Sequence, residues 1–175
     1  NTLYQLYTEP EHIISSAETL LCIPDLLNYF LTGLKMTEHS IASTTQMLSP
    51  NALKWNTELL DKLGLPQRLF TDIKPSGTVL GPLSDSVLAA TGVNNMPVVM
   101  SASHDTASAV VATPAQGEDF VFISCGTWSL MGVESDVPVL TDSSFAEQYS
   151  NEKGAFQKTL LLRNIMGLWL LQEVR

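Results

Sequence analysis

The residues best suited to chemistry are the triplet His104-Asp105-Thr106, which follows an apolar run that ends at Met100. The apolar run predicts a buried strand, and the alanine-rich residues 106–112 predict a helix. An aspartate at the start of a helix lies near the positive end of the helix dipole, which favours its ionised form. Such a carboxylate in a cleft can orient a substrate hydroxyl and accept its proton. The alternatives are that Asp105 only caps its helix and that His104 is structural.

A second candidate site lies further along the chain, where the apolar residues 120–124 are followed by Gly126 and Thr127. Glycine lets backbone N–H groups approach a phosphate closely, and threonine adds a hydroxyl donor. A Gly-Thr pair between two strands is also typical of a plain hairpin turn. The residues leave both interpretations open, and the P-loop pattern is absent from the sequence.

Composition limits the class of protein. The 175 residues are 45% hydrophobic, which is enough for one substantial core or much of a two-lobed one. Nine basic and 18 acidic residues give a net charge of -9, and this balance argues against nucleic acid and anionic membrane surfaces as partners. Two cysteines, Cys22 and Cys125, are too few for a disulfide framework or a zinc site. With neither a signal peptide nor an apolar run of membrane-spanning length, we expect a cytoplasmic protein.

The elements that must position these residues are mixed helices and strands. Apolar side chains at helical spacing predict an amphipathic helix that has Pro24 in its first turn and ends at Gly33. Other helices are expected at residues 1–8, 55–63, 84–91 and 165–174, and strands at residues 75–82, 120–124, 128–134 and 155–162. A linker at residues 114–118 predicts a lobe boundary near Pro114. We expect Trp128 and Trp169 in the core and Cys125 as a buried thiol.

Five segments resemble, in this order, the middle of the FGGY carbohydrate kinases. They are residues 23–33 (IPDLLNYFLTG), 42–46 (ASTTQ), 104–110 (HDTASAV), 124–130 (SCGTWSL) and 164–173 (NIMGLWLLQE). Each motif is short, but five motifs in register are specific. The resemblance covers nearly the whole chain and only the central part of such an enzyme.

The resemblance implies an α/β chain with the actin-like, ribonuclease-H-like ATPase fold, in which two lobes flank a cleft. Residues 1–114 would form the C-terminal part of the N-terminal, sugar-kinase lobe, and residues 115–175 the beginning of the C-terminal, nucleotide-binding lobe. The implied reaction transfers the γ-phosphoryl group of ATP, with Mg²⁺, to a ketose hydroxyl, and O1 of L-rhamnulose is the expected acceptor. The alternatives are xylulose, fuculose or another polyol, or a non-catalytic actin-like interaction module.

The resemblance also assigns roles to individual residues. It implies that Asp105 is the general base, that His104, Thr106 and Asn164 contact the sugar, and that Gly126, Thr127 and Gln172 contact the nucleotide; it implies no metal ligand. A capping role for Asn164 and a merely exposed Gln172 remain open.

Two features depart from the family pattern. Cys125 stands where serine is commoner, and Lys153 interrupts a stretch that usually reads Asn-Glu-Gly-Gly. The family's Asp-Gly-Thr-type phosphate hairpin and its glycine-rich adenosine site lie outside these residues. Because phosphoryl transfer depends on positioned charge, we expect the 175 residues to be inactive alone. Homo-oligomerisation is left open.

Overall fold

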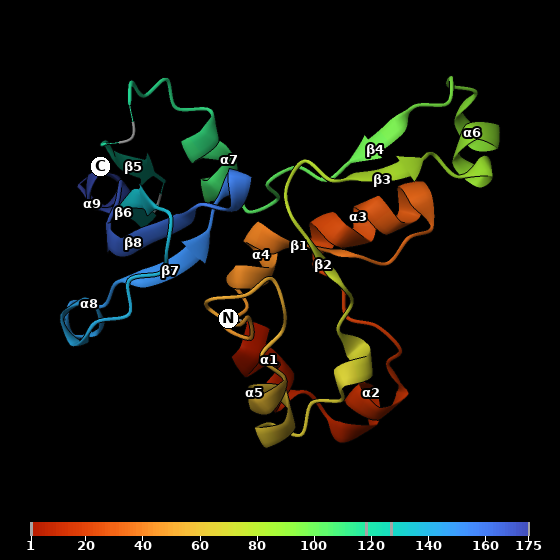
Figure 1. Ribbon diagram of the computed structural model, residues 1–175, viewed down its shortest axis with the longest axis horizontal. Coiled ribbons are helices and arrows are strands. Elements are labelled where there is room, and N and C mark those ends of the chain that lie inside the picture. Colours follow the sequence, from red (N-terminus) through yellow and green to blue (C-terminus); the bar gives the residue numbers. More distant parts are fainter. Residues whose placement is uncertain (1, 118, 127, 175) are drawn as a thin grey trace. The chain divides into compact units, whose positions relative to one another are not determined.

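The computed structural model describes residues 2–117, 119–126 and 128–174, and the chain divides into two compact units (Figure 1). Unit 1 is Asn1–Ser103 and unit 2 is His104–Arg175. The division falls before the boundary predicted near Pro114, because the helix that begins at Asp105 packs against a strand of unit 2. The assignment of residues 1–114 and 115–175 to two kinase lobes stays a prediction.

Unit 1 is built from short helices and two small two-stranded sheets. Its helices are α1 (Thr2–Thr8), α2 (Glu11–Ser16), α3 (Ile23–Thr32), α4 (His39–Ser43), α5 (Thr57–Lys62), the 3-10 helix η1 (Gln67–Leu69) and α6 (Asp85–Thr91). Strand β1 (Thr37–Glu38) pairs in parallel with β2 (Ile73–Lys74), and β3 (Val79–Pro82) pairs antiparallel with β4 (Pro97–Val99).

Local sequence explains where the helices of unit 1 begin and end. Helix α3 has a proline in its first turn and ends at Gly33, whose φ of 78° suits glycine and whose N–H donates to the carbonyl of Tyr29. Helix α5 is capped by Asn56, whose side chain accepts a hydrogen bond from the N–H of Leu59. Both predicted helices are confirmed.

The core of unit 1 gathers around Met47, Leu60 and Leu65, which are buried together. Partly buried side chains pack against this cluster, namely Leu3, Leu6, Ile14, Trp55, Leu63 and Phe70. The strand predicted to be buried before Met100 is not buried as a whole. Met100 is buried, but Val99 is 48% exposed, because β4 pairs with β3 in a sheet of only two strands.

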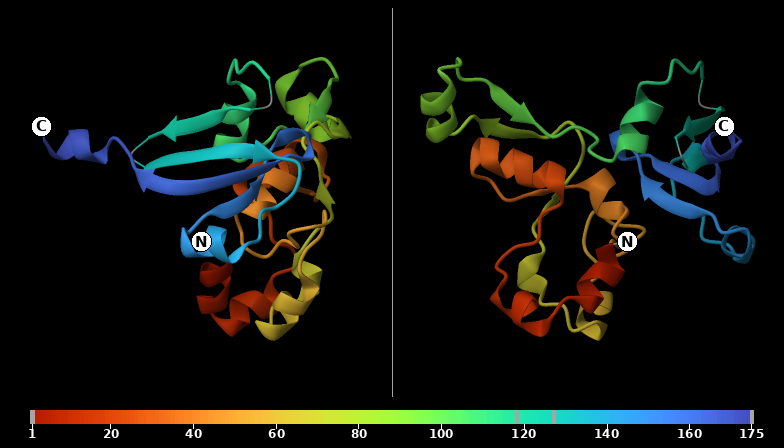
Figure 2. Two further views of the ribbon diagram at one scale, coloured as in Figure 1. Left: turned by 60° about the vertical axis from the view of Figure 1, so that its left-hand side comes forward. Right: turned by 180° about the vertical axis from the view of Figure 1, so that it is seen from behind.

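Unit 2 is a four-stranded antiparallel sheet with the strand order β5-β6-β8-β7. Its elements are α7 (Asp105–Val111), β5 (Val121–Cys125), β6 (Trp128–Ser135), α8 (Asp142–Ala146), β7 (Ser150–Lys153), the 3-10 helix η2 (Ala155–Gln157), β8 (Thr159–Met166) and α9 (Trp169–Glu173). Helix α7 lies against β5 and η2, and α9 lies beyond the end of the sheet (Figure 2). The predicted pairing of β5 with β6 as a hairpin is confirmed.

The last segment differs from its prediction. Residues 165–174 were expected to be helical, yet β8 continues to Met166 and the helix spans only Trp169–Glu173. Pairing explains the difference, because Ile165 and Met166 lie opposite Ser129 and Trp128 of β6. Contacts from a distant strand outweigh the local helical periodicity.

Candidate functional site

One face of the unit 2 sheet carries both a buried core and an open site. Residues directly opposite each other in an antiparallel sheet share a face. The register therefore aligns Phe122 with Leu162 in one row, and Ser124 with Asn164 in the next row on the same face, each pair through a residue of β6. Phe122 and Leu162 are buried, as are Ala107 and Val110 of α7. Beyond this core, the second row opens on a pocket.

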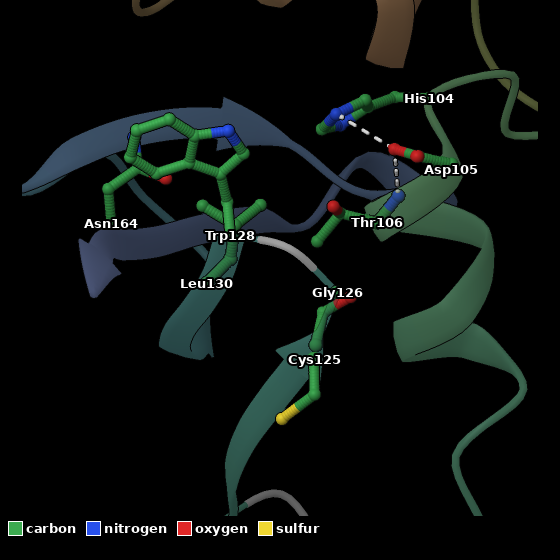
Figure 3. A pocket seen from close by; sticks show the side chains of 9 residues that line it. His104, Asp105, Thr106, Cys125, Gly126, Trp128, Leu130 and Asn164 are labelled. Atoms are coloured by element: carbon green, nitrogen blue, oxygen red, sulfur yellow. Dashed lines mark hydrogen bonds and ion pairs between the residues drawn. The ribbon is translucent and has the colours of Figure 1, made fainter. Parts of the chain in front are cut away.

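The pocket has a volume of about 630 Å³, within the range of small-molecule sites. Residues from α7, from the β5–β6 hairpin and from β8 line it: His104, Asp105, Thr106, Ser124, Cys125, Gly126, Trp128, Leu130 and Asn164. Figure 3 shows His104 and Asp105 on one side of the pocket and Trp128 and Asn164 on the other. Among the described residues, those that line the pocket include no lysine and no arginine.

Asp105 is the first residue of α7, and its side chain is 96% exposed. The N-cap position belongs to His104, so Asp105 is not the N-cap residue. Its Oδ1 does accept a hydrogen bond from the N–H of Thr106 at 2.7 Å, which fixes the carboxylate at the start of the helix. Thr106 itself is buried and lines the same pocket.

His104 lies between two carboxylates. Its Nε2 is 3.3 Å from Oδ1 of Asp105, and its Nδ1 is 3.2 Å from Oε2 of Glu152 on β7. Burial raises the pKa of Glu152 above its ordinary value; His104 acts in the opposite direction, and the charge of Asp105 adds to the rise. Glu152 did not emerge from the sequence as a site residue. Its only signal there was the Asn-Glu-Gly-Gly-like stretch that Lys153 interrupts.

Gly126 lines the pocket, and both of its backbone groups are used within the protein. Its N–H donates to the carbonyl of Trp128 at 2.8 Å, and its carbonyl accepts from the N–H of Leu168 at 2.9 Å. The hairpin-turn interpretation thus holds for Gly126, and its N–H is already engaged. Thr127, the predicted phosphate contact, lies outside the described residues.

Of the two candidates near the C-terminal end of the sequence, Asn164 lines the pocket and Gln172 does not. Asn164 lies within β8 and lines the pocket, so it does not cap a helix. Gln172 is exposed on α9 and is not among the described residues that line this pocket. Two expectations for neighbouring residues are wrong: Trp128 is 73% exposed instead of buried, and the thiol of Cys125 is exposed. Both residues line the pocket. Trp169, also expected in the core, is 42% exposed.

Side chains of the described part of the chain form no cluster of metal ligands. Residues 2–117, 119–126 and 128–174 contain no group of three or more His, Cys, Asp or Glu side chains able to hold one. Within the same ranges, every helix is too short or too polar to span a membrane.

Comparison with known proteins identifies the family. The profile described as "FGGY family of carbohydrate kinases, N-terminal domain" matches residues 3–112. The chain is similar to the rhamnulokinase of Enterococcus faecalis, with 44% identity over 99% of this chain and 35% of that protein. It is similar to the rhamnulokinase of Bacillus subtilis, with 38% identity over 100% of this chain and 36% of that protein. The chain thus spans little more than a third of the length of these curated relatives.

Solved structures agree on the fold. A xylulose kinase from Lactobacillus acidophilus superposes with a TM-score of 0.83 at 22% identity, over 99% of this chain and 35% of that one. A gluconate kinase from the same organism gives a TM-score of 0.84 at 22% identity, over 99% of this chain and 36% of that one. The predicted α/β, actin-like ATPase fold is confirmed, and so is the resemblance to the family.

Proposed function

Because this chain belongs to the FGGY family of carbohydrate kinases, we propose that the protein containing it transfers the γ-phosphoryl group of ATP to a ketose, with O1 of L-rhamnulose as the acceptor. The product would be L-rhamnulose 1-phosphate. The choice of sugar is supported by relatives named rhamnulokinase at 38% to 44% identity, compared with 22% for the xylulose kinase and gluconate kinase structures.

The observation that carries the proposal is the exposed carboxylate of Asp105 at the rim of a pocket that other hydrogen-bonding side chains also line. The described lining combines this carboxylate with an imidazole, hydroxyl groups and the amide of Asn164, beside the apolar Trp128 and Leu130, and it includes no lysine or arginine. Such groups suit a neutral, hydroxyl-rich ligand. The described pocket therefore supports the sugar half of the reaction better than the nucleotide half.

Asp105 would act as the general base. Its carboxylate would accept the proton of the sugar hydroxyl while the hydroxyl oxygen bonds to the γ-phosphorus, and the bond from that phosphorus to the β,γ-bridging oxygen would break to release ADP. His104, Thr106 and Asn164 would hold the sugar. ATP supplies the phosphoryl group, and Mg²⁺ neutralises its charge, when they are bound.

The nucleotide contacts remain part of the proposal. We assign Gly126, Thr127 and Gln172 to the nucleotide by family resemblance, with residues 115–175 at the beginning of the nucleotide-binding lobe and residues 1–114 in the sugar-kinase lobe. Of these residues, Gly126 borders the pocket, but its N–H already donates to the carbonyl of Trp128. A nucleotide contact at this turn would therefore involve another group.

The test uses the full-length protein that contains this chain, assayed with ATP and Mg²⁺ against L-rhamnulose, xylulose and fuculose. We expect kcat/KM to be highest for L-rhamnulose. Asp105→Asn should lower kcat by about three orders of magnitude, since general-base catalysis contributes roughly 10²- to 10⁴-fold. Sugar affinity should change little, because the amide keeps the size of the carboxyl group. Asp85→Asn, on exposed α6 of unit 1, is the matched control and should leave kcat unchanged.

Two results would refute parts of this proposal. Equal turnover of xylulose and L-rhamnulose would refute the choice of sugar. Near-normal turnover by Asp105→Asn would refute the base. A non-catalytic interaction module, the alternative from another class, would turn over none of the sugars.

A further inference from the structure

His104 links the exposed Asp105 to a second carboxylate that lies deeper in unit 2. The two contacts leave from opposite sides of the imidazole ring, Nε2 toward Asp105 at 3.3 Å and Nδ1 toward Glu152 at 3.2 Å. The side chain of Asp105 is 96% exposed, whereas those of His104 and Glu152 are only 16% and 19% exposed. Glu152 is not one of the residues that line the pocket.

A glutamate at this position does little to stabilise the fold, because its carboxylate is largely removed from water. Removing a carboxylate from water carries a penalty of several kcal/mol that a single partner seldom repays. Its cross-strand neighbour is the fully buried Leu160 of β8, which offers no polar side chain. Among the described residues, the charged side chain in contact with Glu152 is the imidazole beside the proposed base, with 3.2 Å between Nδ1 and Oε2. This choice of partner points to a role at the site.

The chemistry of imidazole explains what that role is. A neutral imidazole has one N–H donor and one bare nitrogen, and the partner of one nitrogen decides what the other can do. A protonated Glu152 would donate to Nδ1 and leave Nε2–H to face Asp105. An ionised Glu152 would accept a hydrogen bond from Nδ1–H. In each case the contact with Glu152 constrains the orientation of the ring.

We propose that Glu152 is a positioning residue for the reaction put forward above, holding the imidazole of His104 so that Nε2 faces the carboxylate of Asp105. The inference rests on that proposed function. Glu152 does not touch the pocket, and it acts on the base only through His104.

The charged surroundings of Glu152 are few in the described part of unit 2. His104 and Asp105 face it from α7. On its own strand, Lys153 points to the other face of the sheet, where Nζ donates to Oγ1 of Thr159. Glu134 of β6 lies in the same cross-strand row, with Leu160 between the two glutamates. Apart from burial, the described groups that act on the pKa of Glu152 are therefore His104, which lowers it, and Asp105, which raises it.

Two variants of the full-length protein test the inference. Glu152→Leu places a somewhat larger apolar side chain that cannot hydrogen-bond to Nδ1, and we expect kcat with L-rhamnulose to fall roughly ten- to a hundredfold, as when a group that orients a histidine is removed. Glu152→Gln can donate to Nδ1 or accept from it, so it should restore kcat to within a few-fold of the parent. Neither variant should alter KM for ATP. Glu147→Gln, which removes an exposed carboxylate paired with Arg163, is the matched control and should behave as the parent.

A pH profile separates positioning from a merely structural role. In the parent protein, kcat should show a step above the ordinary carboxyl range that arises from Glu152, and Glu152→Gln should lack this step. The proposal is overturned if Glu152→Leu folds and keeps kcat within twofold of the parent, if Glu152→Gln is as impaired as Glu152→Leu, or if the step persists in Glu152→Gln. If the leucine variant does not fold, the profile of Glu152→Gln decides alone.

A readout independent of turnover distinguishes this inference from the proposed function. In protein labelled with ¹⁵N-histidine, the Nδ1 and Nε2 signals that disappear in His104→Asn belong to His104. We expect Glu152→Leu to shift these signals strongly and Glu147→Gln to leave them unchanged. If the signals respond in this way while the parent phosphorylates no ketose, the proposed function fails and the Glu152–His104 contact stands. If kinase activity is present and the signals do not respond, the positioning role fails.

Discussion

At the scale of single residues, the two thiols of the chain lie in opposite environments. Cys125 is exposed at the rim of the pocket, whereas Cys22 is partly buried next to α3. Burial, with a smaller contribution from the charge of Asp25, raises the pKa of Cys22 to about 11. Because the thiolate is the reactive form, Cys22 should react slowly near neutral pH.

We therefore predict that iodoacetamide modifies Cys125 well before Cys22 in the full-length protein. Peptide mapping by mass spectrometry after timed labelling measures both rates in one sample. Saturating L-rhamnulose with ATP should slow the labelling of Cys125, since this residue lines the pocket, and should leave Cys22 unchanged. Equal rates for the two thiols, or faster labelling of Cys22, would contradict the environments described here.

The sequence pointed to those pocket-lining residues whose signals are local. His104, Asp105 and Thr106 are adjacent, follow an apolar run and open a helix, so their type and spacing were visible without a structure. Glu152 was not identified, because its contact with His104 depends on the packing of α7 against a sheet whose strands are distant in the chain. The exposure of Trp128 was missed for a related reason: an aromatic residue in an apolar strand predicts core unless the covering elements are known.

At the scale of elements, the contact between β6 and β8 decides how the site is supported. Gly132 of β6 lies opposite Leu162, in the buried row beneath the pocket-forming row. A Cβ atom on Gly132 would lie 2.4 Å from the carbonyl oxygen of Leu161 and 2.8 Å from the Cβ of Leu162. The two strands approach each other here more closely than any side chain on Gly132 would allow.

Gly132→Ala should consequently destabilise the protein by about 1–3 kcal/mol, as overpacking in a core does, because the backbone of β8 must move to admit the methyl group. Chemical denaturation of the full-length protein measures the change. Gly117→Ala is the control within unit 2, since a methyl group on Gly117 would meet no atom within 4 Å and would carry only the penalty of the φ of +82° at this position. A Gly132→Ala variant no less stable than Gly117→Ala would show that the strands can separate freely.

Several elements followed from local patterns, and the departure at residues 165–174 has a long-range cause. Proline and glycine at the ends of α3, and the glycine between β5 and β6, placed these elements correctly. Residues 165–174 carry the apolar spacing of a helix, but Ile165 and Met166 pair with β6 and extend β8. The sequence of β8 alone does not indicate which strand it pairs with. Long-range pairing is therefore the part of this fold that local reasoning could not supply.

At the scale of the whole molecule, the buried carboxylate of Glu38 links several segments of unit 1 through hydrogen bonds. Its oxygens accept hydrogen bonds from Ser40 and Ile41 at the start of α4, from Ser76 ahead of β3, and from the N–H and hydroxyl of Ser103. Burial alone would raise the pKa of Glu38, but these hydrogen bonds outweigh it and hold the pKa below its ordinary value. Glu38 thus stays charged, and segments far apart in the sequence converge on it.

The neighbouring Asp25 is fully buried and behaves in the opposite way. Its Oδ1 accepts from the N–H of Glu38 at 3.0 Å, yet burial raises its pKa to about 7, with the charge of Glu38 adding to the rise. In the unfolded chain an aspartate has a pKa of about 3.9. Between about pH 4 and pH 7 the unfolded state loses this proton while the folded state keeps it, so the contribution of Asp25 to stability falls as the pH rises through this window.

Asp25→Asn removes the titration while keeping an oxygen that can accept from Glu38. The free energy of unfolding of the variant, relative to that of the parent, should increase by on the order of 3 kcal/mol as the pH is raised from about 5 to about 8. Each pKa unit corresponds to about 1.4 kcal/mol. Thermal unfolding of the full-length protein at the two pH values gives the difference. Asp85→Asn, at an exposed position, should show no such pH-dependent gain. If Asp25→Asn loses stability equally at both pH values, Asp25 is ionised throughout, and the two buried carboxylates of unit 1 coexist as charges.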